Sequence, residues 1–467
     1  MADLKATLRQ DAASLQQFVT AIADHCERRN NAAAYLQSSE RFFSYIVKLA
    51  ASTRSFLAQA LESRTDFQDL LDLRSDISVL RAGWRFLHGF VKPVLDADTL
   101  RLPSSLVLGL TSRFREIPQF SDTEFVIYHT DEFNYFNVKL SVLKPGADRI
   151  AGLVSGPSFP DKLGLIGIPY SQASSMFMNC LIPHEMGHHV FGQLSLGLKF
   201  KSQLEQELIA SFGARLPAEA RLQIIERLAF WAEEIFCDLF AVRLVGFCFS
   251  LAFVELFDIS TVLDENSTYS PARATGKTEF LQYPPDLFRL RQQVAVLQQD
   301  NWWSSLQKID SHYVRTFEAA MALSDKDFGF LELSNFLKNI DPTDVLEAFY
   351  VIIPTIFNEL DKNTSGIQLG TSGWQSTDKD IALYLRNGIV PSSIRLEASG
   401  AITIHPEPIS LLNSAYKFYL EGLNDLILNI EDADVTNIAD RSKWAKKVEM
   451  WTAKAIEDVM LMTGRVS

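Results

Sequence analysis

One stretch of the sequence limits the fold more than any other, because it is strongly apolar and still carries three acids. It covers residues 230–246 and reads FWAEEIFCDLFAVRLVG. We expect a buried helix here, and a buried helix carries acids only for a reason, since burying an unpaired charge is expensive. Glu234 and Asp238 are four residues apart and share one helix face, whereas Glu233 is turned away by about 100°. Unless these acids form a solvated edge, the fold has to bring partners to them.

A histidine motif precedes this stretch, within LIPHEMGHHVFGQL at residues 181–194. His184 and His188 are spaced i, i+4, so on a helix both imidazoles project from one face and can reach a single Zn²⁺. Glu185 can lean toward a metal-bound water and accept its proton as the water attacks a carbonyl. The motif therefore predicts a zinc site with its own general base. The alternative is a polar helix face that binds no metal.

Three neighbours of these residues bear on how the helix is built. Pro183 immediately precedes the first histidine, and a proline inside a helix removes a hydrogen bond, so the helix either begins here or is kinked. We expect Gly187 to keep the helix slim where a substrate approaches. His189 points away from the histidine pair, and we expect it to be a packing or hydrogen-bonding residue, not a ligand.

A catalytic zinc usually has three protein ligands and an open position for water, so a third ligand is needed. Glu234 is the candidate, because it lies on the apolar helix and shares a face with Asp238. Asp238, one turn along, can accept a hydrogen bond from the far nitrogen of a ligating histidine. Glu233 is the other candidate ligand, although its partner one turn along would then be Cys237, which is a poor orienting group.

The two motifs together, H-E-x-x-H and then E-x-x-x-D on a later helix, resemble the gluzincin metallopeptidases. The resemblance covers about residues 152–291. The upstream segment LGLIGIP lies where gluzincins place the sheet edge along which an extended substrate binds. The resemblance implies the following roles: zinc ligands His184, His188 and Glu234, general base Glu185, and orienting carboxylate Asp238.

A further segment, QYPPDLFRLR at residues 282–291, is similar to part of the CAAX prenyl protease and HtpX-like branch of that family. In that branch a histidine precedes one or two prolines, and an arginine lies six residues after the histidine. Tyr283 stands at the histidine position here, and Arg289 stands at the arginine position. A tyrosine can donate a hydrogen bond to an oxyanion, so Tyr283 is the candidate for this role. The alternative is that Tyr-Pro-Pro shapes a turn with the ring packed in the core.

Hydropathy patterns divide the chain into helical and strand-forming parts. Helical spacing over residues 4–95 predicts about three long helices, and it returns from about residue 174. Four short segments between them predict a small sheet: EFVIYHT (124–130), FNVKLSVL (136–143), RIAGLVS (149–155) and LGLIGIP (163–169). Farther along, the Gly-, Ser- and Thr-rich residues 361–380 predict an exposed loop, and residues 393–405 predict a small hairpin.

These patterns and the resemblance together predict an α+β fold that is mainly α. A zincin-like metallopeptidase core, with a small sheet and the active-site helices, would cover residues 111–295. Helical regions would flank it at 1–110 and 296–467. The most apolar stretch, residues 244–254, is bounded by Arg243 and Glu255 and is too short to cross a bilayer, so we expect a buried helix and no transmembrane segment.

Charge and cysteine usage narrow the possible partners. A net charge of −13 without a basic cluster argues against a nucleic-acid partner, since phosphate binding depends on Lys and Arg. Four scattered cysteines and the lack of a secretory signal fit a cytoplasmic protein with reduced thiols.

Taken with the motifs and the resemblance, the sequence predicts a zinc-dependent metallopeptidase acting on a protein or peptide substrate. The alternatives are a zinc-stabilised binding protein without turnover and a helical interaction protein with a chance motif.

Overall fold

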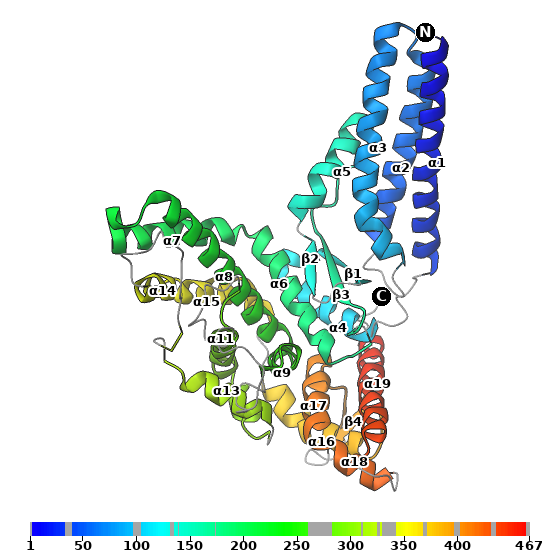
Figure 1. Ribbon diagram of the computed structural model, residues 1–467. Coiled ribbons are helices and arrows are strands. Elements are labelled where there is room, and N and C mark those ends of the chain that lie inside the picture. Colours follow the sequence, from blue (N-terminus) through cyan, green and yellow to red (C-terminus); the bar gives the residue numbers. More distant parts are fainter. Residues whose placement is uncertain are drawn as a thin grey trace. The chain divides into compact units, whose positions relative to one another are not determined.

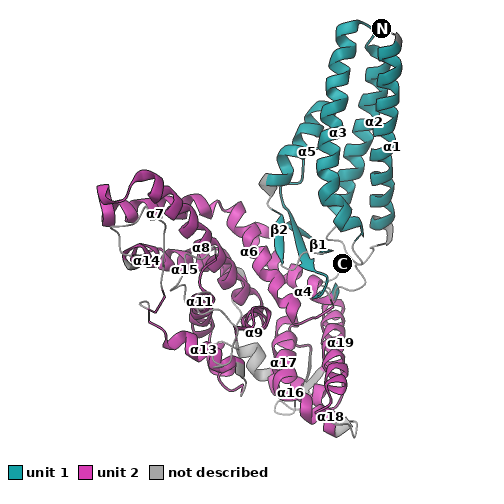
Figure 2. Ribbon diagram, viewed as in Figure 1, with its two compact units in different colours: residues 1–104, 122–173 teal, residues 105–121, 174–467 magenta. Residues whose placement is uncertain are grey.

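The computed structural model is mainly helical with a small three-stranded sheet, which confirms an α+β fold that is mainly α (Figure 1). The residues that it describes are 2–32, 40–96, 104–130, 135–138, 140–172, 174–259, 283–309, 312–324, 327–328, 342–367, 371–396, 402–430 and 436–463. They form two compact units (Figure 2). Unit 1 comprises residues 1–104 and 122–173, and unit 2 comprises residues 105–121 and 174–467. These units group the chain differently from the three predicted regions, because the strands belong with the first helices.

Unit 1 is built on three long helices that lie side by side: α1 (Ala2–Ala32), α2 (Glu40–Ser63) and α3 (Phe67–Asp96) (Figure 1). The helical spacing over residues 4–95 is thus confirmed. Apolar side chains one or two turns apart face a common core, in which Trp84 is fully buried. The indole Nε1 of Trp84 donates to Thr53 Oγ1 at 3.1 Å, so the one polar atom of this ring has a partner inside the core.

The sheet of unit 1 has the strand order β1-β3-β2. Strand β3 (Leu163–Pro169) pairs in parallel with β1 (Glu124–Thr130) and antiparallel with β2 (Phe136–Val138). Every residue of β3 is buried. In the part of the chain that the structure describes, β3 is therefore the central strand. The expectation that LGLIGIP forms a sheet edge is wrong, because both of its sides are paired.

The strand predicted at residues 149–155 is also wrong, because most of it belongs to helix α5 (Leu140–Val154). Of the described residues of FNVKLSVL, the first three form strand β2 and the last four begin α5. Leu143, Ala147 and Ile150 are buried and spaced three or four residues apart, so one face of α5 packs against α2 and α3. A short apolar run reads alike for a strand and for a buried helix, and here the helical spacing extends over the longer window.

Unit 2 is organised around α8 (Ala218–Val245), in which every residue from 231 to 245 is buried. Its neighbours are α6 (Ile182–Gln193), α7 (Leu196–Phe212), α9 (Phe247–Leu256), α11 (Asp286–Gln299) and α15 (Ile353–Thr364). Gly246, with φ of 73°, separates α8 from α9. The buried helix predicted at 244–254 is confirmed apart from this break. No helix among the described residues is long and apolar enough to cross a membrane.

The remaining elements lie mostly in unit 2. They are α4 (Ser104–Arg115), η3 (Pro118–Phe120), η4 (Met178–Leu181), η5 (Gly213–Arg215), α12 (Trp303–Leu306), α13 (His312–Ala322), α14 (Pro342–Tyr350), η9 (Ser365–Ile367), α16 (Thr371–Arg386), β4 (Ile394–Leu396), β5 (Ile402–Ile404), α17 (Pro408–Glu421), α18 (Leu423–Ile430) and α19 (Ile438–Met462). The two strands of the predicted hairpin are confirmed, since β4 and β5 pair antiparallel; residues 397–401 between them lie outside the described part of the chain. The predicted loop at 361–380 is wrong for its described residues, which form the end of α15, η9 and the start of α16; residues 368–370 lie outside the described part of the chain. Thr377, Ile381 and Leu385 are buried at helical spacing, and this face packs against α17.

Candidate metal centre

The histidine motif lies at the beginning of α6. Pro183 occupies one of the first two positions of this helix, directly after η4. A proline is tolerated there, because the backbone N–H it lacks would have no partner within the helix, so of the two possibilities the helix begins here. His184 and Glu185 consequently lie in the first turn, and His188 lies one turn later.

A glycine allows α6 to approach α8 closely. A Cβ built on Gly187 would lie 2.8 Å from Cα and 3.1 Å from Cβ of Cys237. Real Cβ atoms do not come this near to a backbone carbon, so no larger residue fits without separating the helices. Gly187 therefore allows α6 to pack on α8. The sequence had suggested that it makes room for a substrate, but the position faces Cys237 of α8 instead. It brings the histidines of one helix against the acids of the other.

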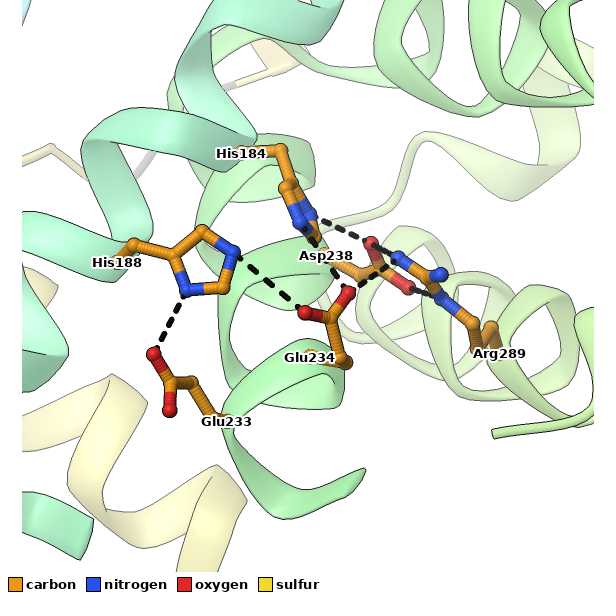
Figure 3. Close-up of polar contacts among 6 residues, drawn as sticks. All are labelled: His184, His188, Glu233, Glu234, Asp238 and Arg289. Carbon is orange, nitrogen blue, oxygen red and sulfur yellow. Dashed lines mark hydrogen bonds and ion pairs between the residues drawn. The ribbon is translucent and has the colours of Figure 1, made fainter. Parts of the chain in front are cut away.

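The two histidines and Glu234 converge at this crossing (Figure 3). Nε2 of His184 lies 3.4 Å from one carboxylate oxygen of Glu234, and Nε2 of His188 lies 3.6 Å from the other. All three candidate ligand atoms lie within 4.8 Å of one another. These are the residues that the i, i+4 spacing indicated, and together they could hold a metal ion.

The other nitrogen of each imidazole faces a second carboxylate. His184 Nδ1 lies 2.9 Å from Asp238, as the sequence predicted, and His188 Nδ1 lies 2.9 Å from Glu233 (Figure 3). An Nδ1–H that donates to a carboxylate fixes the tautomer and leaves the Nε2 lone pair for a metal. The sequence offered Glu233 only as an alternative ligand. The sequence held one indication of this role for Glu233. It is the third acid on a helix predicted to be buried, and the roles of ligand and orienting carboxylate had been given to the other two.

Arg289 of α11 neutralises part of this acidic cluster. Its Nε and Nη2 donate to the two oxygens of Asp238, each at 2.7 Å, and Nη2 also lies 3.3 Å from Glu234. Burial raises the pKa of the Asp238 carboxyl, but the charge and hydrogen bonds of Arg289 outweigh burial and lower it. The guanidinium thus keeps Asp238 ionised, and an ionised carboxylate accepts a stronger hydrogen bond from His184.

The surroundings favour a positive charge between the histidines and Glu234. Burial lowers the pKa of His184, but its contacts with Asp238 and Glu234 outweigh burial and raise the pKa to about 10. Burial raises the pKa of Glu234, but His184 and the charge of Arg289 lower it to about 2. A divalent cation bound by the Nε2 atoms and Glu234 would lie where the site stabilises positive charge.

The candidate general base and oxyanion donor lie near this cluster. Glu185 is buried, and burial raises the pKa of its carboxyl against the opposing charges of His188 and His184. Burial also raises the pKa of Tyr283, with a further rise from the charge of Glu234. The Tyr283 side chain is 43% exposed, and its ring meets Phe230 edge-on. A ring packed in the core, the alternative for Tyr283, is not what the structure shows.

His189 is buried and is not part of the cluster that could hold a metal. Burial alone lowers its pKa to about 4, so the ring is neutral at physiological pH. This agrees with the expectation of a packing or hydrogen-bonding residue.

Comparisons of the chain with models of protein families, with curated proteins and with solved structures gave no match. Any function has to be inferred from the chain's own residues and their geometry. The donor set of the cluster, two imidazole nitrogens and one carboxylate oxygen, is one that catalytic zinc sites use.

Proposed function

We propose that the chain is a zinc-dependent metallopeptidase with a zincin-like core. The observation that supports this most is the convergence of His184, His188 and Glu234, with both histidines oriented by carboxylates. Three ligands leave a fourth position open for water or substrate, as in catalytic zinc sites. The sequence resemblance to gluzincins points to the same reaction class.

Zinc, when bound by these ligands, supplies a Lewis acid that polarises a peptide carbonyl and lowers the pKa of water. Glu185 is the residue that moves the proton. Its burial raises the pKa of the carboxyl toward the range of an effective base, so that it accepts a proton from the attacking water and later delivers it to the leaving amine. Because Glu185 follows His184 directly, both groups come from the same helical turn.

Tyr283 is the proposed donor to the developing oxyanion. Its hydroxyl belongs to a half-exposed ring that is within electrostatic reach of Glu234 and Glu185. A phenol donates well to an oxyanion and is neutral at physiological pH, particularly where its pKa is raised. Its contribution would be made in the transition state rather than in ground-state binding.

The test uses the full chain with one equivalent of zinc and a diverse peptide mixture, with products identified by mass spectrometry. We expect cleavage by the wild type and none by Glu185→Gln, which should keep its zinc because the substituted group is not a ligand. Glu205→Gln, at an exposed position on α7, is the control and should cleave as the wild type does. Cleavage by Glu185→Gln at the wild-type rate would rule out the base. A wild type that binds zinc and cleaves nothing would favour the binding-protein alternative.

A further inference from the structure

The most informative contact outside the proposed ligand set is the one between Glu233 and His188. Glu233 Oε1 lies 2.9 Å from Nδ1 of His188, which is the nitrogen that points away from Glu234 (Figure 3). Glu233 is therefore not positioned as a ligand, since it meets the far side of the imidazole. At this distance the pair makes a hydrogen bond in which Nδ1–H donates to the carboxylate.

We propose that Glu233 is a positioning residue that fixes His188 for metal binding, separately from the Asp238–Arg289 pair that fixes His184. This inference rests on the proposed metal site. The two carboxylates hold different rings, and their surroundings differ. Asp238 is fully buried and carries two hydrogen bonds from Arg289, whereas the Glu233 side chain is 11% exposed. The site would thus have two separate orienting contacts, one for each histidine.

The difference in surroundings predicts different effects of substitution. Loss of Asp238 would leave the buried guanidinium of Arg289 without its main partner, so it would damage folding as well as metal binding. Loss of Glu233 removes the hydrogen bond to Nδ1 of His188. We therefore expect Glu233 variants to fold normally and to lose metal affinity, because His188 becomes free to rotate and to change its tautomer.

The test measures zinc affinity by competition with a chromophoric chelator and records the absorption bands of the cobalt(II)-loaded chain. Glu233→Ala should bind zinc about 10–100-fold more weakly than the wild type and shift the cobalt bands. Glu233→Gln should recover part of the affinity, since its amide oxygen can still accept from Nδ1–H. Glu219→Ala, which removes an exposed acid from the first turn of the same helix, should change neither.

A double-mutant cycle separates positioning from a general charge effect. In a His188→Ala background, Glu233→Ala should cause no further loss of zinc affinity, whereas in a His184→Ala background the loss should persist. An equal loss in both backgrounds would overturn the proposal, as would affinity within about twofold of wild type for Glu233→Ala. A loss as large as that of Glu234→Ala would make Glu233 a ligand instead. These measurements use no peptide, so they test the role of Glu233 even if the chain lacks peptidase activity. A wild-type chain that binds neither zinc nor cobalt(II) would overturn both this proposal and the proposed function.

Discussion

Replacing Gly187 by alanine tests how far the metal centre depends on the close approach of α6 and α8. The new Cβ would lie 2.8 Å from a backbone carbon of Cys237, where about 3.5–4.0 Å is the normal separation of carbon atoms. A backbone atom cannot rotate away, so the helices must part by about 1 Å. The Nδ1–carboxylate contacts of His184 and His188, now 2.9 Å, would then approach or exceed the limit of a hydrogen bond.

The energetic effect has two opposing parts. Overpacking costs about 1–3 kcal/mol, while alanine gains about 1 kcal/mol over glycine inside a helix. We therefore expect a net loss of up to about 2 kcal/mol in the free energy of unfolding of the metal-free chain. Zinc affinity should fall by at least about 10-fold, since both orienting contacts weaken together.

The measurements are urea unfolding of the metal-free chain and a zinc competition titration. Gly192→Ala is a matched control in the same helix, because a Cβ there meets nothing within 4 Å. Gly192→Ala should leave zinc affinity unchanged and should not lower the free energy of unfolding. If Gly187→Ala is as stable as Gly192→Ala and binds zinc as tightly, the close crossing does not position the ligands.

Three other substitutions have defined outcomes. Arg243 is fully buried and lies 2.8 Å from Asp300 and 2.9 Å from Asp361. Arg243→Met should therefore lower the free energy of unfolding in urea by about 3 kcal/mol. This is the lower end of the range for breaking a buried ion pair, because Asp361 is partly exposed. Tyr283→Phe should lower kcat by about 10²–10³-fold at unchanged zinc content; unchanged turnover would leave the oxyanion donor unassigned. Burial raises the pKa of Tyr128 to about 12. The phenol of the unfolded chain ionises near pH 10. The contribution of Tyr128 to the free energy of unfolding is therefore complete below pH 10 and falls by up to about 3 kcal/mol as pH rises to 12. Tyr128→Phe should reduce this slope when unfolding is measured at several pH values.

Local spacing predicted the features that lie within a single helix. The three long helices α1, α2 and α3 follow from apolar residues repeating over long windows, and the faces of α6 and α8 follow from the i, i+4 spacing within each. That spacing selected His184, His188, Glu234 and Asp238, which meet in the structure. Each of these features depends only on the geometry of one element.

The features that the sequence missed depend on how elements cross or pair. Gly187 meets Cys237, and Glu233 meets His188, only because α6 and α8 cross at one point and in one register. The central position of β3 depends on pairing with strands distant in sequence, which its own residues do not specify. The errors at 149–155 and 361–380 have a similar cause: most of a short apolar run, and the described residues of a run of small polar residues, are helical because a neighbouring helix covers one face.

Zinc stoichiometry, measured by native mass spectrometry on the full chain with added zinc, tests the proposed site most directly. We expect one zinc per chain in the wild type, because three ligands converge and both histidines are oriented. Glu234→Ala should carry essentially none, while circular dichroism shows the same helical content as the wild type. A folded wild-type chain that binds no zinc, or a Glu234→Ala chain that keeps a full equivalent, would contradict the proposed site.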